Sequence, residues 1–167
     1  MTQEGRGPYG MFIIEERNAP AERRADREEF MLLADGMGYV INGKEFPMTE
    51  PIHMRLGERV RVRMANLGAM YHPMHLHGGY MTVIAKDGFP LPAPQDMNTI
   101  SLAPGETYDV ILEPQFAGTW IWHCHVLSHA TGPKDGNGHE TSAGMIGVIV
   151  VDDGRTPLAD MSNHTNH

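Results

Sequence analysis

The stretch ERVRVRMANL, residues 58–67, indicates which secondary structure this chain uses. Its apolar side chains Val60, Val62 and Met64 alternate with two arginines and an alanine. Successive side chains of a β-strand point to opposite faces of a sheet. The stretch is therefore predicted to be a strand with one face in a core and the other face outside it.

Other short apolar segments recur along the chain, separated by Gly, Pro or Asn-Gly turns. We predict strands within residues 10–16, 28–35, 39–44, 80–88, 98–114 (with a Pro-Gly turn at 104–105), 118–126 and 144–153. A helix is expected at most in the charged segment 19–29, which also suits a linker. Many short strands joined by turns favour an all-β fold, an antiparallel Greek-key β-sandwich.

Composition limits the classes of function. With 167 residues and 41% hydrophobic content, the chain can bury one core. A net charge of −8 without a basic cluster argues against nucleic-acid and anionic-membrane partners. The sequence has no apolar run near the roughly 20 residues that span a bilayer, and no signal peptide is seen at its start. A single cysteine excludes an intrachain disulfide and a Cys-rich zinc site.

Histidines give the strongest chemical signal in the sequence. Six of the ten lie in two short segments, HPMHLH (72–77) and HCHVLSH (123–129), and the second also holds the single cysteine, Cys124. The other histidines, at positions 53, 139, 164 and 167, are expected to be ordinary surface or packing residues. Such tight grouping of metal-binding side chains predicts a metal site.

Alternation on extended segments sorts these residues into two sites. His75 and His77 are expected on one face, as are His123 and His125, whereas Cys124 points the opposite way. Four imidazoles without a neighbouring carboxylate suit copper or zinc.

On the cysteine side, His129 and His72 can join Cys124, with a distant methionine as a weak axial ligand. A thiolate, two imidazoles and a thioether form the ligand set of a blue-copper electron-transfer site. Zinc has no need of the cysteine on the opposite face. A cupin-type site lacks its carboxylate here, and a cysteine nucleophile leaves the other histidines unexplained.

HPMHLHG, WHCHVLSH and a later Gly-Met together resemble the two copper signatures of the multicopper oxidase family. The similarity extends from about residue 56 to residue 152 and includes VRVRMANLG, DMNTISLAPGETYDVILEP and GMIGVIVV. The resemblance implies a cupredoxin-like Greek-key β-sandwich with copper as the cofactor. It also implies a laccase-like oxidoreductase, which oxidises a small phenolic or metal-ion reductant by single electrons and reduces O2 to water.

The resemblance implies a role for each ligand. It implies a type 1 copper site formed by His72, Cys124, His129 and Met145, a type 2 ligand in His75, and type 3 ligands in His77, His123 and His125. In such enzymes, electrons pass from the type 1 site through the cysteine and its flanking histidines to a trinuclear centre.

The trinuclear centre of the family takes four histidines from each of two domains, whereas this chain carries one set of four. We therefore expect association with a second cupredoxin domain, or a homo-oligomer. Residues 1–16 are expected to contain the last strand of a preceding cupredoxin domain, because GPYGMFIIEE resembles it. Residues 17–27 then form a linker, 28–153 the copper-binding domain and 154–167 a flexible tail.

A long polar segment separates Met145 from the other type 1 ligands, since it lies 16 positions after His129. Residues 130–144 are rich in glycine and polar side chains, so we expect a surface loop beside the type 1 site. This loop either shapes access to the site or is an inert insertion. His139 and Glu140 within it are a weak candidate for an additional metal site.

Two other functions stay open. A non-catalytic cupredoxin would only carry electrons, and a copper nitrite reductase also pairs a type 1 site with a histidine-only site at a subunit interface. Histidines on both sides of Cys124 are typical of the oxidase pattern. The resemblance further implies an extracellular or periplasmic location.

Overall fold

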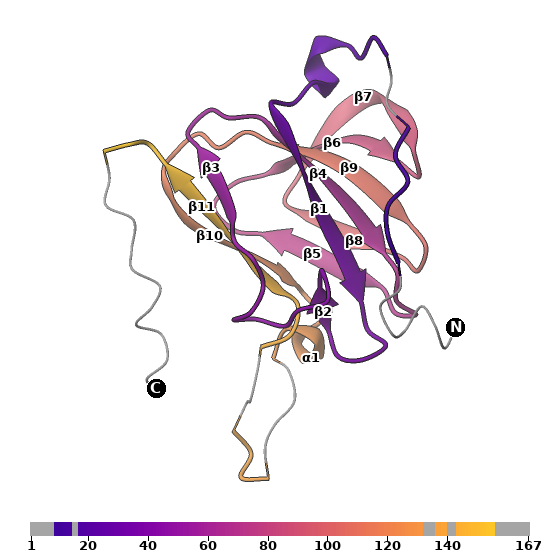
Figure 1. The fold of residues 1–167 in the computed structure, drawn as a ribbon, viewed down its shortest axis with the longest axis vertical. Coiled ribbons are helices and arrows are strands. Elements are labelled where there is room, and N and C mark those ends of the chain that lie inside the picture. Colours follow the sequence, from indigo (N-terminus) through magenta and orange to yellow (C-terminus); the bar gives the residue numbers. More distant parts are fainter. Residues whose placement is uncertain (1–8, 15–16, 132–135, 140–142, 156–167) are drawn as a thin grey trace.

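Two β-sheets pack face to face in the computed structural model, which describes residues 9–14, 17–131, 136–139 and 143–155 (Figure 1). One sheet has six strands in the order β2-β1-β4-β9-β6-β7, and the other has five in the order β3-β11-β10-β5-β8. The pairs β1/β4 and β3/β11 are parallel, and the other pairs are antiparallel. The predicted all-β sandwich is thereby confirmed.

The strands are short, as the sequence pattern predicts. Their bounds are β1 Arg27–Ala34, β2 Val40–Ile41, β3 Ile52–Arg55, β4 Val60–Asn66, β5 His72–Leu76, β6 Met81–Lys86, β7 Phe89–Met97, β8 Thr99–Leu102, β9 Thr107–Leu112, β10 Gly118–Cys124 and β11 Ile146–Asp152. The described helices are a 3-10 turn, η2 Ala21–Arg23, and one short helix, α1 Leu127–Ala130. None of the described helices is long and apolar enough to cross a membrane.

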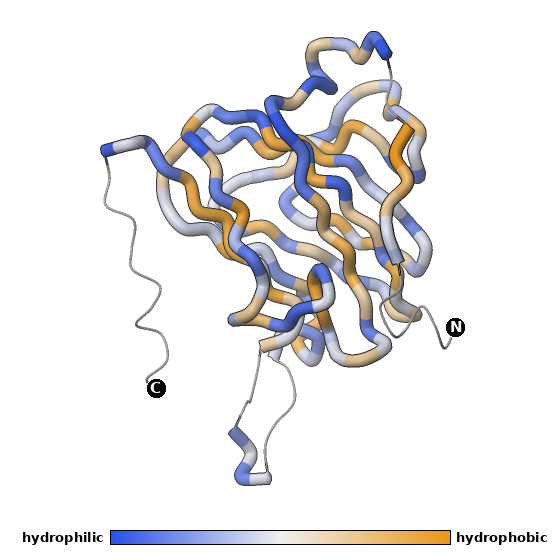
Figure 2. Tube along the Cα trace, in the orientation of Figure 1, coloured by the Kyte–Doolittle hydropathy of each residue, from blue (hydrophilic) through white to orange (hydrophobic). Residues whose placement is uncertain are grey.

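The core lies between the two sheets. Val60, Val62 and Met64 of β4 are fully buried in the core, as predicted, although Arg63 and Ala65 on the other face of the strand are also buried. The first three belong to one hydrophobic cluster with Leu76 of β5 and Trp122 of β10. Apolar colour follows the central strands of both sheets in Figure 2, whereas the connecting loops are mostly hydrophilic. The two inner faces thus form the single core that the composition predicts.

Arg63 is buried on the outer face of the six-stranded sheet, with 8% of its surface exposed. Its guanidinium contacts Glu28 at 2.9 Å and Asp109 at 2.7 Å. A buried charge is tolerated when it is paired in this way. Residues 11–14 line a surface pocket with side chains of β4, β6 and β9, so the N-terminal segment crosses this face.

Two expectations about the first thirty residues are wrong. Residues 10–14 form no strand, because they cross the face of the six-stranded sheet instead of lying along an edge, and residues 15–16 are outside the described part. Segment 19–29 is not a helix beyond the turn Ala21–Arg23, because the chain pairs with β4 from Arg27 onward.

Strands β3 and β7 were not predicted from the sequence. The proposed domain and linker boundaries stay predictions, and the tails 1–8 and 156–167 lie outside the described residues.

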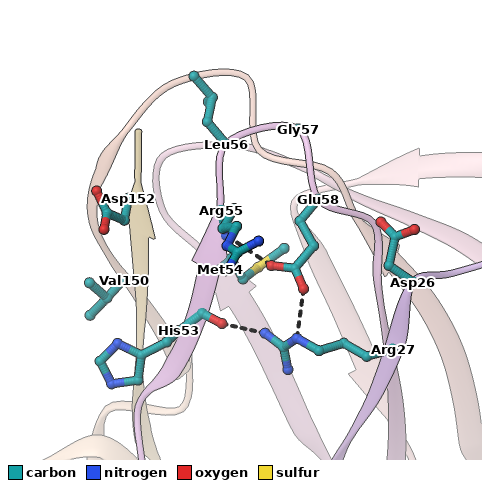
Figure 3. A pocket seen from close by; sticks show the side chains of 10 residues that line it. All are labelled: Asp26, Arg27, His53, Met54, Arg55, Leu56, Gly57, Glu58, Val150 and Asp152. Atoms are coloured by element: carbon teal, nitrogen blue, oxygen red, sulfur yellow. Dashed lines mark hydrogen bonds and ion pairs between the residues drawn. The ribbon is translucent and has the colours of Figure 1, made fainter. Parts of the chain in front are cut away.

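A surface pocket at the start of β1 and beside β3 contains His53 (Figure 3). Arg27 contacts Glu58 at 2.8 Å and also donates to the carbonyl oxygen of His53. These contacts tie β1 to the β3–β4 loop. The exposed His53 lies outside both histidine groups, as predicted.

Candidate metal centre

The two histidine segments lie side by side as neighbouring strands. β5 and β10 are antiparallel, with His75 opposite His123 and Met74 opposite Cys124. The pairing continues past the end of β10, where the backbone N–H of His125 donates to the carbonyl of Pro73 at 2.7 Å. Cross-strand pairing therefore brings together two segments that lie far apart in the sequence.

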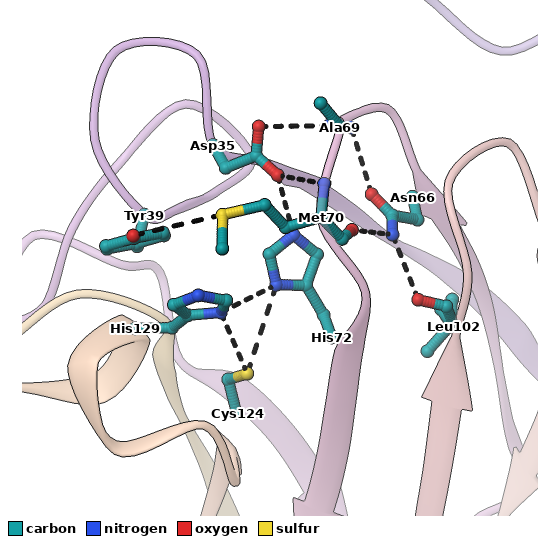
Figure 4. Close-up of polar contacts among 10 residues, drawn as sticks. Asp35, Tyr39, Asn66, Ala69, Met70, His72, Leu102, Cys124 and His129 are labelled. Carbon is teal, nitrogen blue, oxygen red and sulfur yellow. Dashed lines mark hydrogen bonds and ion pairs between the residues drawn. The ribbon is translucent and has the colours of Figure 1, made fainter.

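Side chains on the inner face of these strands converge at one end of the core (Figure 4). His72 Nδ1 lies 3.2 Å from His129 Nδ1, and Cys124 Sγ lies 3.9 Å and 3.6 Å from these two nitrogens, respectively. All three side chains are buried, with at most 1% exposed. Among the described residues, this is the one group of three or more His, Cys, Asp or Glu donors whose ligand atoms lie within 4.8 Å of one another.

The spacing of these atoms fits a metal ion. Bonds of about 2.0 Å to nitrogen and about 2.3 Å to sulfur, arranged in a trigonal plane, place the ligand atoms roughly 3.5–3.8 Å apart. The observed distances, 3.2, 3.6 and 3.9 Å, scatter about that range. Two imidazoles and a thiol also suit copper by their chemistry.

Burial sets the protonation of the three groups. It lowers the pKa of His72, helped by repulsion from His129, while Asp35 acts in the opposite direction. It also lowers the pKa of His129 and raises the pKa of the Cys124 thiol. The imidazoles are therefore neutral near pH 7 and can act as ligands, whereas the thiol must release a proton when a metal binds.

Helix α1 and a tyrosine position His129. The backbone N–H of His129 donates to Val126 at 2.9 Å, which closes the turn after β10. The Tyr39 ring stacks on the imidazole, with ring centroids 4.1 Å apart and planes inclined by 20°. The Tyr39 hydroxyl lies 4.0 Å from Met70 Sδ, so these two side chains cover His129 (Figure 4).

Met145 joins this end of the core although a long segment separates it from His129. Its backbone N–H donates to the His129 carbonyl at 2.8 Å, and its carbonyl accepts from Cys124 at 3.0 Å. Met145 is fully buried. Ala143, near the end of the 130–144 segment, is held by an isolated β-bridge to Phe46. The backbone contacts therefore hold Met145 beside the other predicted ligands, whatever the length of the loop.

Gly144 allows this close approach, and its replacement is a first prediction. An alanine Cβ there would lie 2.2 Å from the His129 carbonyl oxygen. We expect Gly144→Ala to lower the free energy of unfolding by about 1–3 kcal/mol and to weaken copper binding. Urea unfolding of the metal-free protein and copper titration measure these effects.

Gly147→Ala is the matched control, because its Cβ would meet its nearest atoms at an ordinary 3.7 Å. If Gly144→Ala matched this control in stability and in copper affinity, the close packing of Gly144 would have no importance for the site.

The outer face of β5 and β10 carries the four other histidines. The ring centroids of His75 and His77 are 4.9 Å apart, and those of His123 and His125 are 5.4 Å apart. His77 Nε2 lies 3.0 Å from His123 Nε2. The structure therefore brings the four imidazoles together on the face opposite Cys124, as the alternation predicted.

These four side chains are partly open to solvent. His77 and His125 are exposed, and His75 and His123 are partly buried. Burial lowers the pKa of His75, and the nearby His77, His123 and His125 lower it further. Imidazoles on an open face can bind metal, and they leave room for ligands from a second protein surface.

Several supporting residues were missed by the sequence analysis. The Asp35 carboxylate lies 3.3 Å from His72 Nε2. Asn66 donates to the carbonyls of Met70 at 2.7 Å and Leu102 at 3.0 Å, and so shapes the loop that leads into His72. Thr99 contacts His75 Nδ1 at 2.7 Å. These residues have no local sequence pattern that marks them.

The remaining candidates lie mostly beyond the described residues. His139 is exposed, while Glu140, His164 and His167 lie outside the described residues. The additional site in the 130–144 loop therefore stays a prediction.

The chain is similar to known proteins in both sequence and structure. The sequence model for multicopper oxidase matches residues 16–133. The chain is 38% identical over 91 residues to Multicopper oxidase MmcO of Mycobacterium tuberculosis, a match that covers 54% of this chain and 18% of that protein. It therefore spans less than a fifth of that relative.

Solved structures extend the similarity to the fold. The chain superposes on the multicopper oxidase mgLAC with a TM-score of 0.74 and 32% identity, covering 87% of this chain and 50% of that one. It superposes on Blue Copper Oxidase from Nitrosomonas europaea with a TM-score of 0.72 and 31% identity, covering 81% and 47%. The cupredoxin-like form of the sandwich is thereby confirmed, and the chain spans about half of each solved relative.

Proposed function

Because this chain belongs to the multicopper oxidase family, we propose that it takes part in a laccase-like oxidation of a small reductant by single electrons, coupled to reduction of O2 to water. Copper is the cofactor of the family, and when bound it supplies the one-electron chemistry, because it cycles between two oxidation states.

One observation carries the proposal: His123, Cys124 and His125 are consecutive but face two different sites. Cys124 is fully buried beside His72 and His129, while its neighbours lie with the other imidazoles. An electron taken up on the cysteine side can reach either histidine through covalent bonds of one short segment. This continuity provides a direct route between the two groups.

We assign roles to the residues on this basis. In our proposal, His72, Cys124, His129 and Met145 hold the type 1 copper, His75 is the type 2 ligand, and His77, His123 and His125 are type 3 ligands. The burial and convergence of the first group support its assignment. The clustering of the second group supports a histidine-only site.

The reductant, in this proposal, docks over Tyr39 and Met70. His129 is 1% exposed and cannot be touched directly from solvent, whereas Met70 is 44% exposed. Tyr39 stacks on His129 and contacts Met70, so it connects the surface to a type 1 ligand. A small phenolic or metal-ion reductant therefore needs only to reach this rim.

The second half of the histidine-only site comes from another cupredoxin domain or from another subunit. The exposure of His77 and His125 supports this part of the proposal, because an enclosed site would cover them. We also propose that the protein acts outside the cytoplasm, in the extracellular space or periplasm.

A second candidate is a cupredoxin that only carries electrons. It is favoured by the completeness of the buried group within this chain, in contrast to the open half-site on the other face. Such a protein would be reduced and reoxidised by partners without consuming O2. A nitrite reductase is less well supported, because its pattern does not require histidines on both sides of Cys124.

Oxygen uptake distinguishes these functions. We expect the copper-loaded protein, in the assembly it forms, to consume O2 when given a substituted phenol, with water and not peroxide as the product. An oxygen electrode with a peroxide assay measures both quantities. Reduction of the blue chromophore without oxygen uptake would instead identify an electron carrier, and turnover of nitrite in place of O2 would identify a nitrite reductase.

A further inference from the structure

The side chain of Asp35, just after β1, is buried beside the proposed type 1 site, with 7% of its surface exposed. Its two carboxylate oxygens accept the backbone N–H groups of Ala69 at 3.0 Å and Met70 at 2.8 Å. One of the oxygens also lies 3.3 Å from His72 Nε2 (Figure 4). The carboxylate therefore connects the end of β1, the loop before β5 and a predicted ligand.

The surrounding backbone is shaped to admit this carboxylate. A Cβ added at Gly68 would lie 2.3 Å from Asp35 Oδ2, so only glycine leaves room for the side chain. Gly68 in turn is held by its N–H, which donates to Asn66 Oδ1 at 2.9 Å. Burying a carboxylate is unfavourable unless its oxygens are well paired. The Asp35 oxygens are paired in this way with the backbone N–H groups of Ala69 and Met70.

The Nε2 atom of His72 makes no hydrogen bond within the part of the chain that the structure describes, and the Asp35 carboxylate faces it at 3.3 Å. A neutral imidazole carries one proton, on either Nδ1 or Nε2. A carboxylate opposite Nε2 favours the proton there, which leaves the Nδ1 lone pair free to bind a metal. His72 Nδ1 is the atom that faces Cys124 and His129.

From this geometry we propose that Asp35 is a positioning residue of the type 1 site, which fixes the Nε2-protonated form of His72 and lowers the reduction potential of the site through its negative charge. This inference rests on the proposed copper site of His72, Cys124 and His129. The sign follows from electrostatics: a nearby anion stabilises the more positive, oxidised state of the site, so removing the anion favours reduction.

His129 provides an internal contrast. Its Nε2 is buried without a hydrogen-bond partner among the described residues, and its ring is held by stacking against Tyr39. The two imidazoles are therefore fixed in different ways. The charge of Asp35 also acts on His129, where it opposes the lowering of the pKa by burial. Its direct contact is with His72, so an effect on the tautomer is expected at His72 and not at His129.

Asp35→Asn tests the charge with little change in shape. The amide oxygen can still accept one of the two backbone N–H groups, but the amide nitrogen cannot accept a hydrogen bond from His72 Nε2. We expect a higher reduction potential, by about 59 mV, which corresponds to a tenfold change in a one-electron equilibrium constant. Spectroelectrochemical titration of the blue chromophore measures this shift.

Asp109→Asn is the matched control, because Asp109 is also a largely buried, ion-paired carboxylate, 2.7 Å from Arg63 and on another face of the sandwich. It is expected to change stability without changing the potential. If Asp35→Asn left the potential within the range of this control, Asp35 would have a structural role only and the proposal would be overturned.

A measurement on the unmodified, metal-free protein keeps the proposal testable if the variant does not fold. Nitrogen-15 NMR of the histidine rings reports which nitrogen carries the proton. We expect His72 in the Nε2-protonated form, and the Nδ1-protonated form would overturn the proposal. Because this readout needs neither copper nor turnover, it stays decisive even if the protein proves not to be an oxidase.

Discussion

Cys124→Ser is expected to remove the blue absorption completely and to lower oxygen uptake by at least about 100-fold. Loss of a residue that only hydrogen-bonds a metal ligand already costs up to about 100-fold in activity, and Cys124 is itself a proposed ligand. A hydroxyl is a poor substitute for a thiolate as a ligand of copper. Cys124 also joins the two groups of ligands through its backbone. Visible and EPR spectroscopy, with oxygen uptake, measure the effect.

A control in the same core tests whether a modest loss of packing alone removes the chromophore, and circular dichroism checks that the Cys124→Ser protein is folded. Ile100 of β8 is buried, and its strand partner is Met74 of β5, which in turn pairs with Cys124 of β10. Ile100→Val removes one methylene-sized group and typically costs about 0.5–1.5 kcal/mol, yet it should keep the chromophore. A Cys124→Ser protein that retained the blue absorption would show that the cysteine is not a copper ligand.

His77→Gln is expected to produce the complementary loss. His77 is exposed, and its Nε2 atom lies 3.0 Å from Nε2 of His123. Removing the imidazole should therefore disturb the histidine-only site and not the core. In the assembled enzyme we expect oxygen uptake to fall by at least about 100-fold while the blue absorption is unchanged. Anaerobic reduction of the chromophore by the phenol should proceed at its normal rate.

His53→Gln serves as the control, since His53 is an exposed histidine of the same sheet that lies outside both groups. It should change neither property. Equal oxygen uptake in His77→Gln and His53→Gln would contradict the assignment of the four-histidine face as the oxygen-reducing site.

Much of the core and of the site could be predicted because local sequence records them. Burial of one sheet face imposes a period of two on β4, which made Val60, Val62 and Met64 recognisable. The same alternation separated Cys124 from its flanking histidines. The types of the metal-binding side chains and their short spacing thus made the two histidine segments recognisable. Pairing of β5 with β10 brings these two segments together.

Edge strands were harder to predict. β7 contains prolines at positions 90, 92 and 94, which indicate a break in a central strand. The strand forms nevertheless, because β7 lies at the edge of the sheet and, among the described strands, pairs with β6 alone. Half of the N–H groups of an edge strand have no ladder partner, so proline is tolerated there. This position in the sheet is not visible from the local residues.

Contacts between distant segments were missed for a similar reason. Asp35 and Tyr39 lie in the segment that follows β1. Asp35 contacts His72, and Tyr39 stacks on His129. The burial of Arg63 likewise depends on partners in β1 and β9. These contacts are set by the packing of strands that are remote in sequence, and no short motif encodes them.

The number of copper ions bound by the monomer and by each oligomer tests most directly whether this chain holds one complete copper site and half of another. Native mass spectrometry of the copper-loaded protein measures the number of chains and of copper ions in each species. We expect the monomer to retain one copper ion, and further copper to be retained only in assemblies in which a second surface completes the four-histidine site. A monomer that held well above one copper ion per chain and consumed oxygen rapidly would contradict this division of the two sites.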